Sequence, residues 1–126
     1  MELLFDTNIL IYHLNGRLNE PGTDLLRQGL LGEGAYSVIS RIEALGFEQS
    51  KAANTHAKRV LSRLIELPLT SEIAERTIIL RKHFRIKVPD AIIAATALEY
   101  SLQLVTRNQN DFVKIEDLRL INPFDT

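Results

Sequence analysis

The sequence contains no cysteine. This absence excludes disulfide bonds, thiolate metal sites and a thiol nucleophile. Long hydrophobic runs are also missing, since no apolar stretch approaches the roughly 20 residues that a membrane helix needs. The N-terminus lacks a basic region, and Asp6 interrupts its short apolar stretch, so this segment does not resemble a secretory signal. We therefore expect a cytoplasmic protein without a membrane partner.

The chain has almost no net charge, with 15 basic and 16 acidic residues. This balance argues against a generally basic surface for nucleic acids. The charge is unevenly distributed, however. Residues 51–87 hold nine Lys/Arg and three acids, a net charge of +6, so the remainder carries −7. A basic wall beside an acidic pocket would suit a phosphate-chain substrate, and solvated faces of two amphipathic helices explain the pattern equally well.

The length of 126 residues and the hydrophobic content of 45% predict one domain over residues 1–126 with a single core. Short apolar runs alternate with helical patterns along it. The expected strands are 3–5, 35–38, 67–69, 102–106 and 118–121, with Pro68 favouring a sheet edge for the third. The expected helices begin near residue 8, at Thr23, at Ser40, at Thr55, at Ser71 and at Asp90. This alternation predicts a three-layer α/β/α domain with a parallel sheet.

Four carboxylates stand at the borders of apolar segments, where a strand should end or a helix begin. They are Asp6, Glu43, Asp90 and Asp111. In a parallel α/β sheet the ligand site lies at the carboxyl ends of the strands, and helix starts cluster at the same edge. Because a buried carboxylate is costly without a positive partner, several converging acids indicate a hard metal ion.

Each acid also has a purely structural interpretation. Asp6 could cap the first helix, although three capping-type residues in a row exceed what one helix start needs. Glu43 completes a capping-box pattern with Ser40. Asp90 suits the first turn of a helix, and the segment 108–112 could be a polar loop. No single position decides between these interpretations and the metal site.

The order of the motifs is more specific than any one of them. Four segments occur in turn, Leu3-Leu4-Phe5-Asp6-Thr7-Asn8-Ile9-Leu10, Ser37-Val38-Ile39-Ser40-Arg41-Ile42-Glu43, Val88-Pro89-Asp90-Ala91-Ile92-Ile93-Ala94-Ala95 and Leu104-Val105-Thr106-Arg107-Asn108-Gln109-Asn110-Asp111-Phe112. Together they resemble the PIN-domain family, and within it the VapC-type toxins of toxin–antitoxin pairs. The resemblance extends from Leu3 to about Phe112.

The resemblance implies a five-stranded parallel sheet and an endoribonuclease that depends on Mg²⁺ or Mn²⁺. Asp6, Glu43 and Asp90 match the three core acids of the family. Asp111 is the candidate for the fourth, because Asn stands at position 108, where the family can have an acid. The supporting positions are Thr7, Asn8, Thr106 and Asn108. The expected partners are an RNA substrate, a cognate antitoxin protein and a second copy of the chain in a homodimer.

Two other functions remain open from the sequence. A catalytically degenerate PIN-fold binding protein is compatible with the neutral Asn108. A phosphatase with Asp6 as nucleophile is also compatible with the layered fold, but position 8 is Asn where such motifs have a second acid. If the acids do converge, their mutual repulsion predicts that one of them keeps a proton at neutral pH when no metal is bound.

Overall fold

The structure is a computed structural model that describes residues 1–125. Its five strands are β1 (Leu3–Phe5), β2 (Gly34–Ser37), β3 (Ile65–Leu67), β4 (Gln103–Val105) and β5 (Leu120–Ile121). All pairings are parallel, in the order β3-β2-β1-β4-β5. The parallel sheet is therefore confirmed, and β3 lies at an edge. It ends immediately before Pro68, which has no N–H to continue the ladder.

Helices connect the strands. They are α1 (Thr7–Leu14), α2 (Glu20–Gln28), the short turn η1 (Gly29–Glu33), α3 (Val38–Leu45), α4 (Lys51–Ser62), α5 (Ser71–His83), α6 (Val88–Tyr100) and α7 (Gln109–Phe112). Within residues 1–125, none of these helices is both long and apolar enough to span a membrane.

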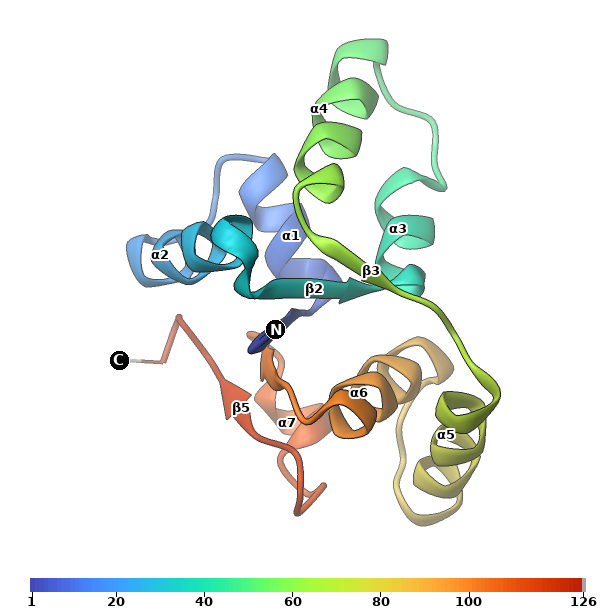
Figure 1. Cartoon of the computed structure of the whole chain (residues 1–126). Coiled ribbons are helices and arrows are strands. Elements are labelled where there is room, and N and C mark those ends of the chain that lie inside the picture. Colours follow the sequence, from blue (N-terminus) through green and yellow to red (C-terminus); the bar gives the residue numbers. More distant parts are fainter. Residues whose placement is uncertain (126) are drawn as a thin grey trace.

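The sheet has a hydrophobic cluster on each face, because successive strand side chains point to opposite sides. In β1, Leu3 and Phe5 pack with side chains of α1, α2 and α4, whereas Leu4 packs with α5 and α6. Figure 1 shows these two sets of helices on opposite sides of the sheet. The expected three-layer α/β/α arrangement is confirmed.

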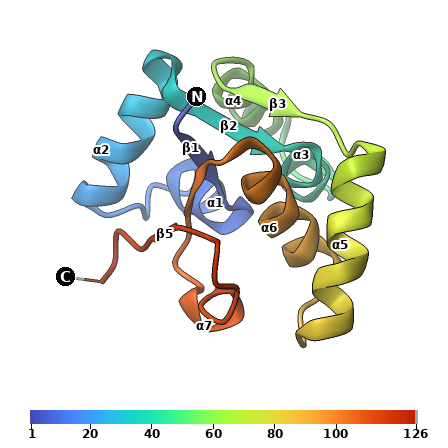
Figure 2. The same ribbon diagram turned by 60° about the horizontal axis from the view of Figure 1, so that its bottom comes forward.

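Helix α6 is the central buried helix that the sequence predicts. Seven consecutive residues, 91–97, are buried in it. Its side chains are apolar on nearly every side, and Figure 2 shows α6 in the interior between α1 and α5. Because the middle of α6 is packed on nearly every side, the first turn of the helix, which contains Asp90, has a fixed position.

Several helices begin earlier than expected, because a different residue provides the N-cap. Asn19 caps α2 by accepting from the Gly22 N–H at 3.0 Å, and Thr23 lies inside the helix. Ser50 caps α4, which begins at Lys51 and not at Thr55. In both cases a favoured capping residue lies a few positions upstream of the predicted start. Helix α5 begins at Ser71 as expected, with Thr70 as its N-cap.

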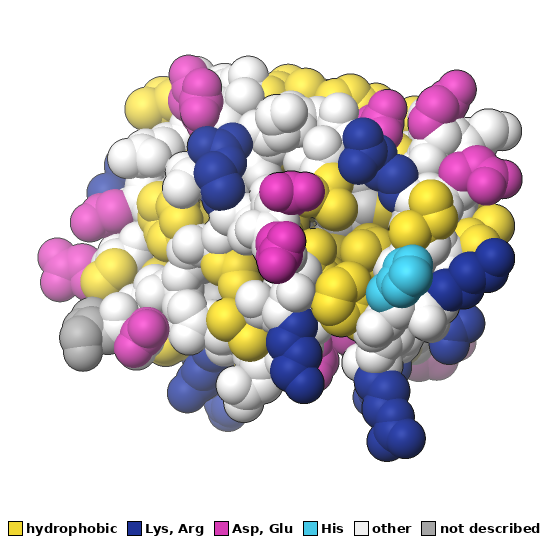
Figure 3. All heavy atoms as spheres, turned by 90° about the horizontal axis from the view of Figure 1, so that it is seen from below, with side chains coloured by type: hydrophobic (Ala, Val, Ile, Leu, Met, Phe, Trp, Pro, Cys, Tyr) yellow, Lys and Arg dark blue, Asp and Glu magenta, His cyan; other side chains and the backbone are white. Residues whose placement is uncertain are grey.

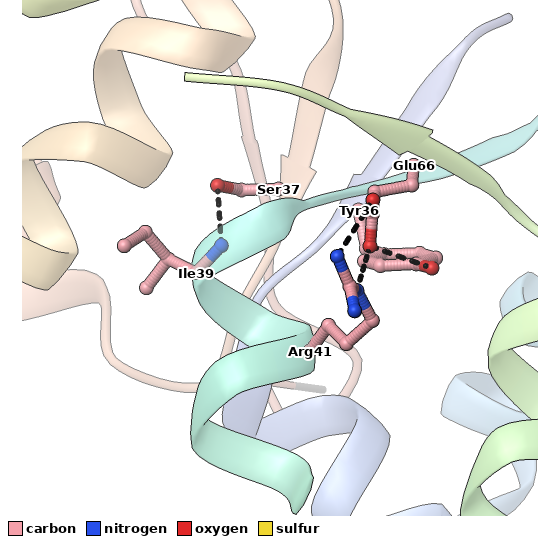
Figure 4. A network of polar contacts seen from close by, with 5 residues as sticks. All are labelled: Tyr36, Ser37, Ile39, Arg41 and Glu66. Carbon is pink, nitrogen blue, oxygen red and sulfur yellow. Dashed lines mark hydrogen bonds and ion pairs between the residues drawn. The ribbon is translucent and has the colours of Figure 1, made fainter. Parts of the chain in front are cut away.

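The junction of β2 and α3 is held from two sides (Figure 4). The Ser37 hydroxyl caps α3 by accepting from the Ile39 N–H at 3.2 Å. On the other side, the Tyr36 hydroxyl donates to Glu66 Oε1 at 3.2 Å, and the Arg41 guanidinium forms an ion pair with the same carboxylate. These contacts tie α3 to β2 and to the edge strand β3, and so fix where the helix leaves the sheet.

Candidate active site

Asp6 directly follows β1 and is only 4% exposed. Its backbone N–H donates to the Val105 carbonyl at 3.0 Å, which ties it to the end of β4. The residue has the N-cap position of α1, but its side chain makes no capping hydrogen bond. Instead, Asp6 Oδ2 accepts from the Thr106 hydroxyl at 2.8 Å. The capping interpretation of this carboxylate is therefore wrong.

Glu43 lies on α3 and faces Thr7 of α1. The Thr7 hydroxyl donates to Glu43 Oε1 at 2.7 Å, and its oxygen lies 2.8 Å from Ser40 Oγ. Ser40 is fully buried inside the helix. The capping box of Ser40 and Glu43 is wrong, since α3 begins at Val38. Glu43 thus points toward the carboxyl edge of the sheet and not back along its own helix.

Asp90 lies in the first turn of α6, as the sequence predicts, and is half-buried. The N-cap position of α6 belongs to Lys87, whose side chain makes no capping hydrogen bond. Burial is the main cause that raises the pKa of Asp90, followed by repulsion from Asp111 and then from Glu43, while Lys87 lowers it. These couplings place Asp90 close to two of the other acids.

Asp111 and Asn108 form a pair at the short helix α7. The Asn108 side-chain amide donates to Asp111 Oδ2. The Asn108 backbone N–H donates to the Thr106 hydroxyl oxygen at 3.0 Å, so the hydroxyl proton of Thr106 is free to point at Asp6. Asn108 is therefore an orienting residue here. Asn8 is exposed, and no side-chain hydrogen bond of it occurs among the described residues.

The four acids form one electrostatic unit, which we call the acid site (Asp6, Glu43, Asp90 and Asp111). Burial raises the pKa of Asp6 to about 6, and repulsion from Asp90 and Glu43 adds to this. Hydrogen bonds from the Thr106 hydroxyl and from the Thr7 backbone N–H lower the pKa and oppose these effects. A pKa of about 6 leaves roughly a tenth of Asp6 protonated at pH 7. Asp6 is therefore mostly ionised at pH 7, so the expected retention of a proton at neutral pH is not met, although the pKa is raised in the expected direction, chiefly by burial.

No positive side chain within residues 1–125 neutralises the acid site by an ion pair. The ion pairs of that region join Arg27 to Asp24, Arg41 to Glu66 and Arg76 to Glu99. Carboxylate oxygens without a basic partner are the donor set that hard divalent cations prefer, so the chemistry of the residues fits such an ion. No three acids or histidines of the described chain stand close enough together to hold an ion between them as they are placed.

Sequence reasoning missed Ser40 as a part of this arrangement. Its spacing of three residues from Glu43 puts both on one face of a helix, which is the signal that could have found it. It also missed Arg107, whose guanidinium stacks on Phe124 and Tyr12. That contact joins residues far apart in the sequence, and no local sequence pattern indicates it.

The sequence model of the PIN domain matches residues 3–118 of this chain, a range that includes all four acids. The chain belongs to the PIN-domain family. This PIN domain is 34% identical over 122 residues to ribonuclease VapC10 of Mycobacterium tuberculosis, with 93% of this chain and 90% of the relative covered. The resemblance predicted from the four motifs is confirmed.

Solved structures of toxin–antitoxin proteins share the fold of this PIN domain. A toxin–antitoxin complex from Klebsiella pneumoniae has a chain of 31% identity and a TM-score of 0.82, with 99% of this chain and 100% of that chain covered. VapBC2 from Rickettsia felis, bound to a DNA fragment from its promoter, has a chain of 26% identity and a TM-score of 0.80, with 97% and 98% covered. The arrangement of the sheet and helices is therefore that of the matching chains in these complexes.

Proposed function

We propose that this PIN domain is an endoribonuclease that depends on Mg²⁺ or Mn²⁺ and acts as the toxin of a toxin–antitoxin pair. The observation that carries the proposal is the acid site. Its carboxylates repel one another at the carboxyl edge of the sheet, and no ion pair in residues 1–125 neutralises them. The 34% identity to a ribonuclease over nearly the whole chain supports the activity.

The chain's own residues have distinct tasks in this proposal. Asp6, Glu43, Asp90 and Asp111 would hold the ion, directly or through water, since Mg²⁺ takes one or two carboxylates and keeps several waters. Thr106 fixes the rotamer of Asp6 by its hydrogen bond of 2.8 Å, and Thr7 does the same for Glu43 at 2.7 Å. Asn108 orients Asp111 by its hydrogen bond. Because position 108 is an asparagine, this loop offers the ion one acid, Asp111, and not two.

When bound, the divalent ion supplies positive charge that activates water and stabilises the negative charge developing on the phosphate. The hydroxyls of Thr7 and Thr106 hold the side chains of Glu43 and Asp6 in fixed orientations. Such partners of ligands are worth roughly 10–100-fold in metal affinity or activity. The preorganisation lies in the tertiary contacts between α1, α3 and the end of β4.

Positive residues must also accept the RNA backbone. Of the basic residues in 51–87, Lys87 is close enough to Asp90 to lower its pKa. Figure 3 shows basic side chains interspersed with acidic and hydrophobic ones on the face seen from below. Basic residues at intervals around an acidic centre would suit a single strand that passes over it.

The partners follow from the same relatives. The similar solved structures are toxin–antitoxin complexes, so we propose a cognate antitoxin as a partner. We also propose that two copies of this chain form a homodimer. Large apolar side chains that are more than 45% exposed on α3 and α5 are available for such interfaces, namely Ile42, Ile78 and Ile79. Light scattering that gives only a monomer at all concentrations contradicts the homodimer.

Purified protein should cleave single-stranded RNA with Mg²⁺ or Mn²⁺ and lose this activity in excess EDTA, because the acid site needs a cation to act on a phosphodiester. Restoring the metal should restore cleavage. The measurement is the fraction of a labelled RNA cleaved with time, with Ca²⁺ as a test of which ion is effective. Activity that survives complete chelation contradicts the proposal.

A catalytically degenerate PIN-fold binding protein is the second candidate. The amide of Asn108, which occupies Asp111 Oδ2, is the observation that favours it. This candidate predicts that the protein shows neither cleavage nor a thermal shift with Mg²⁺ or Mn²⁺. The metal-dependent nuclease predicts both, so the two are separated by measurements on the unmodified protein.

Replacing Thr106 with valine should lower RNA cleavage by roughly 10–100-fold, because the hydroxyl that orients Asp6 is lost. A matched control is Thr77→Val. Thr77 is also buried, and its hydroxyl donates to the Ile73 carbonyl within α5, at 2.7 Å. Steady-state cleavage rates at saturating metal test the prediction. Equal losses in the two variants would indicate a general effect on packing and contradict a role at the acid site.

A further inference from the structure

Arg107 has its guanidinium over two aromatic rings. Its central carbon lies 4.4 Å from the centroid of the Phe124 ring and 5.6 Å from that of Tyr12. The two rings meet edge to face with their centroids 5.5 Å apart. Arg107 Nη1 also donates to the Tyr12 hydroxyl at 3.4 Å. A cation over the ring face is attracted by its negative quadrupole, so the rings form a seat for this side chain, which we call the aromatic seat (Tyr12 and Phe124).

The aromatic seat is built from two ends of the chain. Tyr12 is in α1, whereas Phe124 belongs to the segment that follows β5. Figure 2 shows this last segment running from β5 toward α2. The Asn19 side chain donates to the Pro123 carbonyl at 2.8 Å and fixes the segment there, while within the segment the Phe124 N–H donates to Asn122 Oδ1 at 2.9 Å.

The backbone places Arg107 beside the acid site. The preceding residue, Thr106, donates to Asp6, and the following residue, Asn108, pairs with Asp111. Tyr12 lies six residues beyond Asp6, which corresponds to about 9 Å along a helix at 1.5 Å per residue. The guanidinium contacts the Tyr12 side chain and is thus held against α1, the helix that begins directly after Asp6.

Arg107 is exposed and has no carboxylate partner among residues 1–125. A mobile guanidinium this near several carboxylates would be expected to pair with one of them. The aromatic seat holds it aside, so the carboxylates stay free for a cation. Of its five N–H donors, the contact with Tyr12 occupies one, and the others are available to an incoming ligand.

We propose that Arg107, held on Tyr12 and Phe124, binds a phosphate of the RNA strand next to the one that is cleaved. The inference rests on the proposed ribonuclease function and adds a substrate-positioning residue to it. A planar guanidinium binds two phosphate oxygens at once, and Tyr12 and Phe124, both only partly buried, hold it in position. Arg107 therefore sets the register of the strand over the acid site, and the C-terminal segment contributes to substrate binding through Phe124.

The test compares Arg107→Gln, Arg107→Lys and Phe124→Leu with the unmodified protein and with Arg27→Gln, an exposed arginine of α2 paired with Asp24. Binding of a labelled single-stranded RNA is measured in EDTA by anisotropy, and KM and kcat are measured with Mg²⁺. Loss of a charged hydrogen bond costs roughly 10-fold, so Arg107→Gln should raise Kd and KM about 10-fold and change kcat little. It should also reduce the slope of log Kd against log salt by about 0.7, the value for one phosphate contact of a single strand.

The two other variants separate charge from position. Arg107→Lys should restore the salt slope and only part of the affinity, because a lysine lacks the fork of donors. Phe124→Leu should raise KM while the salt slope stays unchanged, since the charge remains but loses its seat. Unchanged binding, KM and salt slope in Arg107→Gln overturn the proposal, as does the same loss in Arg27→Gln. If Arg107→Gln does not fold, the lysine and leucine variants decide by the same measurements. A protein that binds RNA through Arg107 but cleaves none contradicts the nuclease function alone.

Discussion

Replacing Asp6 with asparagine should lower RNA cleavage by at least about 100-fold, because even partners of metal ligands are worth roughly 10–100-fold. Asp6 is the most buried member of the acid site, and it is coupled to both Asp90 and Glu43. Asparagine keeps the size of the side chain and an oxygen that can accept from Thr106. It removes the negative charge, and the loss of activity thus reports the charge and not the packing.

A matched control is Asp24→Asn, on the exposed surface of α2, where the carboxylate forms an ion pair with Arg27. This variant should cleave RNA at the rate of the unmodified protein. Initial rates at several Mg²⁺ concentrations distinguish weaker metal binding from a slower chemical step. If Asp6→Asn retains most of its activity at saturating Mg²⁺, Asp6 does not hold the ion, and the proposed arrangement of the acid site is wrong.

The metal-free protein should become less stable as the pH rises from about 4 to above 6. Burial raises the pKa of Asp6 from 3.8 to about 6 in the folded state. A folded-state pKa above the unfolded one means that folding favours the protonated carboxyl. This stabilisation is fully present below pH 3.8 and is lost as the pH rises through about 6. The difference in pKa corresponds to an upper limit of about 3 kcal/mol, or a Tm change on the order of 10 °C. The raised pKa of Asp90 acts in the same direction.

Thermal unfolding in EDTA between pH 4.5 and 8 measures this effect. Other carboxylates also titrate at low pH, so the quantity of interest is the difference in Tm between Asp6→Asn and the unmodified protein. That difference should grow in favour of the variant as the pH rises, and added Mg²⁺ should reduce it by stabilising the unmodified protein at pH 8. A difference in Tm that is constant over this pH range would show that the pKa of Asp6 is not raised in the folded state.

The sequence anticipated most of the fold because its hydrophobic periodicity is strong. The strands around Leu4 and Leu104 and the buried helix after Asp90 were predicted within a few residues. The helix starts were less accurate, since several capping residues stand within a few positions of one another and local preference does not choose between them. Ser37 prevails over Ser40 because β2 ends at Ser37 and the chain must turn there.

The amino-acid sequence by itself indicated which residues are candidates for the chemistry. It placed Asp6, Glu43, Asp90 and Asp111 after strands or at helix starts, and parallel topology brings such positions to one edge of the sheet. The placement of Glu43 was wrong, since this residue lies in the second turn of α3. Tertiary structure alone decided what each side chain contacts. Capping was excluded for Asp6 and Glu43 only when Thr106 and Thr7, far away in the sequence, were seen to donate to them. The contact of Arg107 with Tyr12 and Phe124 was also not predictable from the sequence. The reason is physical: local sequence sets the energy of a turn of helix or strand, whereas burial, repulsion and cross-chain hydrogen bonds exist only after distant segments have packed together.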